Sequence, residues 1–477
     1  MTGGLKPYPE YRQCDLAWLK TIPRDWSVMR GKGVFEAIDI RSRTGSEELL
    51  TVSASDGVVP RRHKTVTMFM AKSYVGHKLC WSGDLVVNSL WAWMQGLGVA
   101  GEHGLISSAY SVYRPRLAYR ENSRFFHHLL RSAAYKWELL TRSKGVWLSR
   151  LQLSDLSFMD MPILLPPPED QAAIVRFVEY VGWQVGRAIR AKKKLIALLN
   201  EQKQVIIHRA VTRGVEPTVP LKSSGIPWLS DIPEHWKAPL LGRCIIRVEQ
   251  GWSPVAAEGE LAPDQWAVLM LSSVRRGIFN PSAIKPISPT AEVPTGIEVA
   301  NGDFLLTRSN TRERVGDVCI VRSVRPGTIL CDLIYRLHIR DDLVDPQFLA
   351  YQLLSPYGRT QIERDARGSS GTMPKISQRH IKSWRVLLPP IGEQRSIVSA
   401  IDGDTIKLND LILDTQKEID LIREYQIRLI ADIVTGQLDV GEVSRTLPAA
   451  VDAPELSVEA GAEDGSEELL EAVADHE

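Results

Sequence analysis

The sequence has few cysteines and no long hydrophobic run, and each of these two features excludes a class of protein. It also has almost no net charge. Its five cysteines, which are odd in number and never spaced C-x-x-C, argue against a structural zinc site or a disulfide framework and predict reduced, mostly buried thiols. No stretch of about 18 uncharged apolar residues is present, so we expect no membrane-spanning helix. The N-terminal region lacks the apolar core of a signal peptide, and we expect the protein in the cytoplasm.

Motifs for catalysis and nucleotide binding are also missing. There is no Gly-Lys-Ser/Thr phosphate loop, no His-Glu-x-x-His zinc helix and no Asp/Asn-Pro-Pro-Tyr/Phe loop of an adenine methyltransferase. The segment 96–101 matches G-x-G-x-x-G, but the residues after it lack a helical period, so we expect a flexible glycine loop and no nucleotide site. These absences disfavour a self-contained enzyme and predict a chain without a catalytic residue, cofactor or metal ion of its own.

The net charge of +1 hides an uneven distribution. Residues 446–477 contain ten Asp or Glu and no Lys or Arg, so the rest of the chain carries +11. A body of that sign suits a polyanionic partner. The C-terminal segment 438–477 has no aromatic residue, and we expect an acidic, disordered tail there.

What the sequence does contain is an internal repeat, in which two motifs that flank a central region occur twice and form a duplicated frame. A lead of the form Trp-Leu-x-x-Ile-Pro-x-x-Trp ends at Trp26 and returns at Trp236, 210 residues later. A Leu-Pro-Pro segment that leads to a Gln begins at Leu165 and returns at Leu388, 223 residues later. The tryptophans either hold the lead against the domain that comes next or simply pack in a core, and we favour the second interpretation.

The centres between these edges differ. Short apolar runs come after a Gly-Asp pair at 85–88 and at 304–307, with an offset of 219, and we also predict strands at 108–113 and 329–337. The second centre has therefore gained residues while its edges stayed aligned, as surface loops do at little entropic cost. A duplicated frame around unlike centres predicts one architecture that presents two different recognition surfaces.

After each proline segment, the apolar residues keep the spacing of a coiled-coil seam over about 40 residues, or roughly 60 Å of helix. A stripe this long cannot be buried within its own repeat, so we predict that the two helices pack on each other as an antiparallel coiled coil. Polar residues interrupt the seam at Lys192, Lys203, Thr415 and Gln426. The seam residues are Val178, Val185, Ile189, Ile196, Leu199, Ile206 and Ala210 and, with an offset of 223, Ile401, Leu408, Ile412, Ile419, Ile422, Leu429 and Ile433.

In the order and duplication of its motifs, the chain resembles the specificity subunits of type I restriction–modification systems (HsdS-like proteins). The resemblance covers about residues 10–437 and is carried by the lead 228–236, the helix start 388–394, the segment 104–110 and Ser370-Gly-Thr372. It implies an α+β fold with two target recognition domains of similar topology, two long helices and a pseudo-two-fold arrangement. The expected segments are a first recognition domain (1–168), a spacer helix (169–215), a second recognition domain (216–391), a second spacer helix (392–437) and the acidic tail (438–477).

The resemblance also implies a function and partners. The chain would be the non-catalytic DNA-recognition subunit of a methyltransferase and endonuclease complex, in which each domain reads one half of a bipartite double-stranded target and the helices set the spacing. Its partners would be two DNA adenine methyltransferase subunits, which use S-adenosylmethionine, and motor-nuclease subunits. A coiled-coil interaction scaffold that does not read DNA sequence remains the alternative.

Candidate DNA-binding residues are predicted from the chemistry of base and phosphate recognition. Base edges are read by planar guanidinium and amide groups, and Lys and Arg on loops anchor phosphates. In the second half an arginine-rich run comes directly after a predicted strand, although a solvated charge run is the alternative for it. In the first half one group of candidates is the densest basic cluster of the sequence. The other group consists of residues at positions that resemble the central strand and loop of the family. The candidates are Arg61, Arg62, Lys64, Asn88, Gln95, Ser107, Ser108, Tyr110, Arg275, Arg276, Arg308, Asn310, Arg312 and Arg314.

Overall fold

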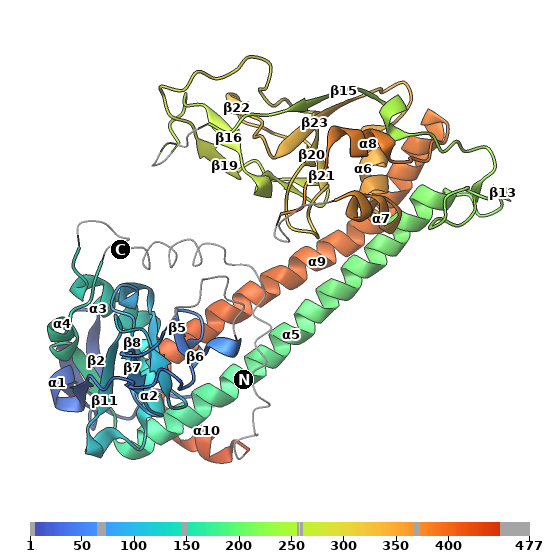
Figure 1. The fold of residues 1–477 in the computed structure, drawn as a ribbon. Helices are drawn as coiled ribbons and strands as arrows, with labels where there is room; N and C mark the ends of the chain where they lie inside the picture. Colours follow the sequence, from blue (N-terminus) through green and yellow to red (C-terminus); the bar gives the residue numbers. More distant parts are fainter. Residues whose placement is uncertain are drawn as a thin grey trace. The chain divides into compact units, whose positions relative to one another are not determined.

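The computed structural model describes residues 5–63, 73–145, 151–254, 257, 261–366 and 373–448. The chain divides into two units, of which unit 1 comprises Met1–Lys192 and Lys417–Glu477 and unit 2 comprises Lys193–Gln416 (Figure 1). Most of the acidic tail, Lys64 and the Ser370-Gly-Thr372 motif lie outside the described residues. Among the helices that are described, none carries an apolar stretch that could cross a membrane.

The two long helices form where the proline segments predict them. Helix α5 spans Pro168–Arg213 and helix α9 spans Ile391–Val434, so each unit holds one part of both. Proline is favoured in the first turn because its missing N–H has no partner there, and acidic side chains in the same turn stabilise the helix N-terminus. Every predicted seam residue is buried or half-buried, which confirms the predicted stripe.

Polar contacts in the seam show the direction of packing. In unit 1 Lys192 forms an ion pair with Glu418, and in unit 2 the Nζ of Lys203 donates to the Oδ1 of Asn409 at 2.8 Å. The α5 position rises from 192 to 203 while the α9 position falls from 418 to 409. The helices are therefore antiparallel, as predicted. Partial burial lowers the pKa of Lys203.

Unit 1 is built on a four-stranded antiparallel sheet in the order β4-β11-β8-β9, that is Phe35–Ile38, Ser111–Pro115, Leu85–Val87 and Leu97–Val99. Four strand pairs accompany it: β1-β2 (Tyr11–Leu16, Leu19–Pro23), β3-β12 (Ser27–Arg30, Pro162–Leu165), β5-β6 (Leu50–Ser53, Gly57–Pro60) and β7-β10 (Lys78–Cys80, Gly104–Ile106). The short helices are α1 (Gly31–Val34), α2 (Ser123–Leu130), α3 (Ala133–Arg142), α4 (Asp155–Met159) and α10 (Gly441–Thr446).

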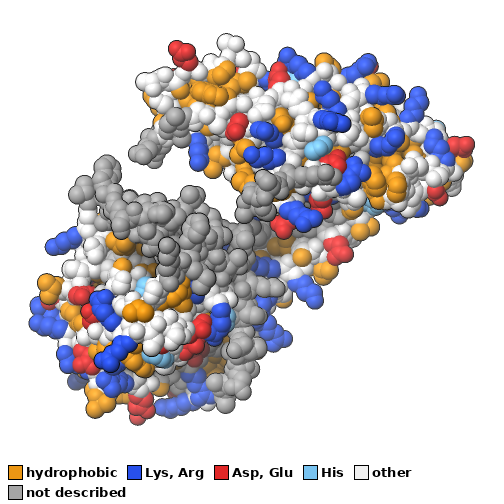
Figure 2. Space-filling view, viewed as in Figure 1, with side chains coloured by type: hydrophobic (Ala, Val, Ile, Leu, Met, Phe, Trp, Pro, Cys, Tyr) orange, Lys and Arg blue, Asp and Glu red, His pale blue; other side chains and the backbone are white. Residues whose placement is uncertain are grey.

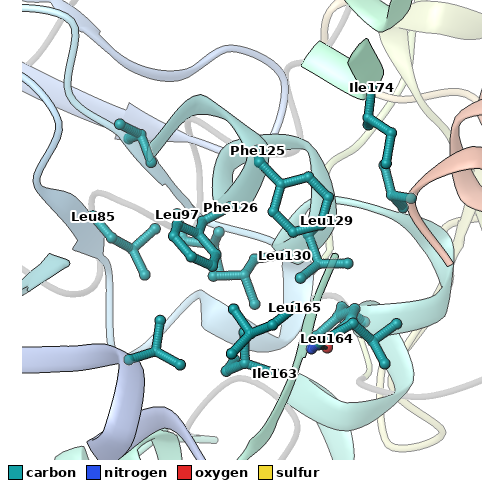
Figure 3. Close-up of a cluster of buried hydrophobic side chains, with 14 of the residues drawn as sticks. Leu85, Leu97, Phe125, Phe126, Leu129, Leu130, Ile163, Leu164, Leu165 and Ile174 are labelled. Atoms are coloured by element: carbon teal, nitrogen blue, oxygen red, sulfur yellow. Dashed lines mark hydrogen bonds between the residues drawn. The ribbon is translucent and has the colours of Figure 1, made fainter. Parts of the chain in front are cut away.

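Helix α2 fills the core of unit 1 because its apolar residues recur every three or four positions. Its fully buried Phe125, Phe126 and Leu129 lie with Leu85 of β8 and Leu97 of β9 in one cluster (Figure 3). The same cluster includes residues 163–165 of β12 and reaches the start of α5, so the four-stranded sheet and the long helix share one core.

Unit 2 repeats the sheet of unit 1. Its four antiparallel strands run in the order β15-β23-β20-β21, that is Ile245–Gln250, Ile334–Ile339, Phe304–Thr307 and Val318–Ile320. Beside it lie β19-β16-β22 (Ile284–Pro286, Ala267–Leu269, Thr328–Ile329), β17-β18 (Val274–Arg275, Ile278–Phe279) and β13-β14 (Leu221–Lys222, Ile232–Pro233). Helices α6, α7 and α8 span Pro346–Leu354, Pro356–Asp365 and Gln378–Ser383. Because both sheets have the same strand order, the predicted α+β fold with two similar domains is confirmed.

The duplicated leads end in two equivalent tryptophans that hold the start of each long helix. Trp26 is 1% exposed and its Nε1 donates to the Oδ2 of Asp170 at 3.1 Å. Trp236 is fully buried and its Nε1 donates to the Oε1 of Glu393 at 3.0 Å. Each indole therefore combines core burial with a charge-assisted hydrogen bond to the first helical turn.

The duplicated Gly-Asp pairs end in two equivalent ion pairs inside the sheets. Asp84 accepts two hydrogen bonds of 2.8 Å from Arg114 on β11, and Asp303 accepts one of 2.8 Å from Arg336 on β23. Both carboxylates also accept from a backbone N–H three residues upstream, at 2.9 Å. The repeat thus preserves a charge pair with one buried and one half-buried member, which joins the turn to the neighbouring strand.

Two strand predictions and one loop prediction need correction. Residues 329–337 form the ends of two strands in different sheets, because β22 pairs with β16 whereas β23 pairs with β15 and β20. The strand predicted at 108–113 begins only at Ser111, because a turn closes between Ser107 and Tyr110. The segment 96–101 is not a flexible loop, since its central residues form β9, where a Cβ on Gly98 would lie 3.0 Å from the Cα of Gly57.

Candidate nucleic-acid interface

The connection between β20 and β21, residues 308–317, is the arginine loop of unit 2. The hydroxyl of Thr307 donates to the carbonyl of Arg314 at 2.8 Å, and the N–H of Gly316 donates to the carbonyl of Thr307 at 2.9 Å. Gly316 has φ +75°, and a Cβ there would lie 2.5 Å from the Cγ2 of Ile362. The loop backbone is therefore closed on itself and packed against helix α7.

A buried carboxylate joins the arginine loop to the β17–β18 hairpin. Asp317 is 1% exposed, its Oδ2 accepts from the N–H of Arg276 at 3.1 Å, and its Oδ1 lies 3.9 Å from the guanidinium of Arg359. Burial raises the pKa of Asp317, and the Arg276 hydrogen bond together with the charges of Arg359, Arg276 and Arg314 oppose that shift. The carboxylate thus gathers cationic residues from three elements.

Four of the predicted arginines of unit 2 are exposed on the two elements that this carboxylate joins. Arg275 and Arg276 lie on the β17–β18 hairpin, and Arg312 and Arg314 lie on the arginine loop. Arg276 adopts the left-handed conformation, with φ +44°, so its backbone is fixed in an unusual turn. Exposed arginine residues on a fixed backbone are suited to contacts with guanine edges or phosphates.

Two other predicted residues of the arginine loop are half-buried and bonded within the protein. Arg308 is half-buried, its Nη1 donates to the carbonyl of Asp332 at 3.3 Å, and its guanidinium carbon lies 5.9 Å from the ring centre of Tyr335. The Oδ1 of Asn310 accepts from the N–H of Thr311 at 2.8 Å. These contacts give Arg308 and Asn310 a place in the loop's own structure.

The predicted residues of unit 1 are spread over several elements. Arg62 is exposed and pairs with Glu48 at 2.6 Å, and its neighbour Arg61 is half-buried. Ser107, Ser108 and Tyr110 come after β10, where Ser108 is exposed and the other two are half-buried.

Asn88 and Gln95 are turned into the protein. Asn88 is 5% exposed and its Oδ1 accepts from the N–H of Leu90 at 3.3 Å. The side-chain amide of Gln95 donates to the carbonyl of Ser132 at 2.8 Å. The sequence could not reveal these orientations, because both residue types also suit base recognition.

Arg359 and Asp317 were not predicted as parts of the site. The Nη1 of Arg359 donates to the carbonyl of Val315 at 2.7 Å, so helix α7 holds the arginine loop directly. The only sequence signal is the Gly316-Asp317 pair, which resembles the Gly-Asp turns before the central strands.

Figure 2 shows Lys and Arg side chains (blue) over the visible faces of both units, with fewer acidic side chains among them. In the described ranges no group of side chains that could hold a metal ion is found.

Comparison with known proteins gives consistent relatives. No protein-family model matches the chain. The specificity subunit of the type I restriction enzyme EcoEI from Escherichia coli is 25% identical over 245 residues, which are 51% of this chain and 40% of that protein. The MjaVIII specificity subunit from Methanocaldococcus jannaschii is 21% identical over 433 residues, which are 88% of this chain and 94% of the relative. The chain thus spans less than half of the length of the EcoEI subunit.

A solved structure supports the same fold. A chain from work on complex assembly and conformational transition of the type I R-M system superposes with a TM-score of 0.57 at 17% identity, over 87% of this chain and 99% of that one. The chain is therefore similar in sequence to the specificity subunits of type I restriction enzymes, and similar in fold to a chain solved in work on the type I R-M system.

Proposed function

We propose that the chain is the DNA sequence-recognition subunit of a type I restriction–modification complex and acts in the cytoplasm. Each unit reads one half of a bipartite double-stranded target. The observation that carries the proposal is the cluster of exposed arginines on two joined loops of unit 2, in a protein whose sheet occurs twice with unlike loops.

The arginine cluster suits DNA for two physical reasons. Lys and Arg that meet phosphates release counterions, which supplies affinity independent of sequence. A guanidinium group that reaches O6 and N7 of guanine adds about 1–3 kcal/mol of discrimination per base pair. We assign base or phosphate contacts to Arg275, Arg276, Arg312 and Arg314, with Arg61, Arg62 and Ser108 as further contacts in unit 1.

The long helices have two tasks in the proposal. They set the spacing between the two half-sites and dock two DNA adenine methyltransferase subunits. Apolar side chains exposed on the helices are suitable contacts, such as Leu198 (53%) and Val205 (63%) on α5 and Leu421 (62%) on α9. The methyltransferase subunits supply S-adenosylmethionine and the chemistry, motor-nuclease subunits join for restriction, and this chain contributes no catalytic group.

The same exposed apolar residues also favour the scaffold alternative, in which the helices bind proteins and DNA is not read. The two functions differ in how binding responds to salt. A DNA reader weakens steeply on duplex DNA as salt rises, with a slope that counts the neutralised phosphates. A scaffold shows no such binding at any salt concentration.

The decisive experiment selects bound sequences from a library of random duplexes with the full chain. We expect enrichment of a split sequence with an unspecified spacer. Replacing Arg312→Gln and Arg314→Gln is expected to relax one half only, by about 10-fold at each affected base pair. The matched control is Arg247→Gln with Arg340→Gln, which removes two exposed charges of the same unit outside the cluster and leaves both halves defined. Equal weakening of both halves by the first pair would assign those arginines to general affinity, and no enrichment would refute the proposal.

A further inference from the structure

Unit 1 contains a loop that is structurally equivalent to the arginine loop but opposite in chemistry. It connects β8 to β9 in the same sheet position, and we name its residues 89–95 the tryptophan loop. Its first residue, Ser89, accepts a backbone hydrogen bond from Leu153 at 2.9 Å, just as Arg308 accepts one from Ile376 at 2.9 Å. Ser89 and Arg308 are 219 residues apart, and Leu153 and Ile376 are 223 residues apart, the same offsets that relate the duplicated motifs. The two backbone hydrogen bonds therefore join equivalent positions of the repeat.

An arginine from the helical layer holds each of these loops. In unit 1 the Nη1 of Arg131 donates to the carbonyls of Gln95 at 3.3 Å and Leu97 at 2.8 Å. Its Nη2 donates to the carbonyls of Ala54 at 2.6 Å and Ser55 at 2.8 Å in the β5–β6 turn. Arg131 therefore fixes the end of the tryptophan loop, as Arg359 fixes the arginine loop.

The polarity of the tryptophan loop is inverted relative to an ordinary surface loop. Its polar side chains face inward, since Ser89 is 6% exposed and the amide of Gln95 is bonded to Ser132. Four apolar side chains are half-buried, namely Leu90, Trp91, Trp93 and Met94, and the half-buried Gln95 beside them has its amide already bonded to the protein. A protein loop usually presents polar groups to water, so four half-buried apolar side chains on one loop are consistent with contact to a partner.

The two tryptophans form a preorganised surface. The rings of Trp91 and Trp93 are stacked, with centroids 6.2 Å apart and planes 17° apart. The Nε1 of Trp93 donates to the carbonyl of Leu90 at 3.0 Å, so its polar edge is occupied within the loop. Gly96 packs closely against Trp91, because a Cβ on Gly96 would lie 2.8 Å from the Cβ of Trp91. Trp93 can thus offer a base a rigid apolar contact.

Resting on the proposed function, we propose that the tryptophan loop determines the specificity of unit 1 and reads its half-site through apolar contact with the 5-methyl group of thymine. Arg131 is the positioning residue of this loop. The thymine methyl is the one apolar group that a base pair presents in the major groove. The equivalence with the arginine loop favours DNA as the occupant over a partner protein, so the two half-sites are read by different chemistry.

The test uses the full chain and the duplex that it selects from random DNA. Each thymine of both half-sites is replaced in turn by deoxyuridine, which lacks only the methyl group. One half-site stays defined when Arg312 and Arg314 are replaced by Gln, and we assign that half-site to unit 1. There, at least one deoxyuridine replacement is expected to weaken binding about 3- to 5-fold, as removal of one buried methyl group does. Trp93→Ala should reduce the thymine-to-uracil ratio at that position to about 1, and Trp93→Phe should retain part of it. Trp266→Ala, which alters a tryptophan of unit 2 that is 40% exposed, is the matched control and should leave the ratio unchanged.

Arg131→Gln tests the positioning role. We expect it to lower the thymine-to-uracil ratio at that position while selectivity at the other base pairs of the same half-site stays unchanged, a separation that destabilisation of unit 1 would not produce. The proposal is overturned if uracil has no effect in that half, if Trp93→Ala leaves the ratio intact, or if Trp93→Ala weakens only a protein partner's binding. Failure to select any sequence would refute the proposed function itself and is therefore distinguishable.

Discussion

The buried Asp84–Arg114 pair is a sensitive test of how the duplicated sheet is held together. Asp84 is 2% exposed and accepts hydrogen bonds from both the Arg114 guanidinium and the N–H of Trp81. Asp84→Ala leaves a guanidinium and a backbone N–H without these partners. Losing one member of a buried ion pair costs about 3–5 kcal/mol, and we expect about 3 because the Arg114 side chain is 24% exposed.

The assay is urea unfolding of the full chain, monitored by tryptophan fluorescence. The double variant Asp84→Ala with Arg114→Met removes the stranded charge, and its loss in free energy of unfolding should be about 1–2 kcal/mol smaller than that of Asp84→Ala alone. Arg62→Met, which removes one side of a pair whose side chains are 52% and 39% exposed, should change stability by less than about 1 kcal/mol. A loss below about 1 kcal/mol for Asp84→Ala, or a double variant as unstable as the single one, would refute the reasoning.

Three further predictions concern stability. Burial lowers the pKa of His127, so the stability that depends on its neutral ring is fully present above about pH 6.5 and is lost as the pH falls. The variant His127→Gln still offers an acceptor to the N–H of Val99. It should therefore flatten the decline of the melting temperature between about pH 7 and 5. Trp236→Phe removes the charge-assisted hydrogen bond to Glu393 and should lower the free energy of unfolding in urea by about 2 kcal/mol. Gly316→Ala, at φ +75°, should lower the melting temperature and weaken DNA binding, whereas an unchanged variant would show that the arginine loop tolerates another conformation.

Much of the frame was predictable because its signals are periodic or repeated. The coiled-coil seam is specified by apolar spacing alone, and the polar interruptions at Lys192 and Lys203 lie in the seam as predicted. The paired tryptophan leads were predicted to pack, but their acidic partners were not. The hydrogen bonds of Trp26 to Asp170 and of Trp236 to Glu393 join residues far apart in the chain, which no local pattern specifies.

The recognition loops were harder to predict because residue type does not reveal orientation. Asn88 and Gln95 have the amides that read adenine, yet their side chains complete the protein's own hydrogen bonds. Arg131 gave no signal, since its role comes from backbone carbonyls of two distant turns that only folding brings together. The exposed arginines of the arginine loop could be predicted because their run comes directly after a buried strand in the sequence. A segment at that position lies at the end of the sheet whatever its tertiary contacts are.

The central claim is that one duplicated frame carries two unlike reading loops. The most direct measurement is methylation-aware sequencing of DNA from cells that express the chain with a type I methyltransferase subunit. The account predicts adenine methylation at an asymmetric bipartite site, in which Trp93→Ala alters one half and Arg312→Gln with Arg314→Gln alters the other. A continuous motif, or variants of both loops that change the same half, would contradict it.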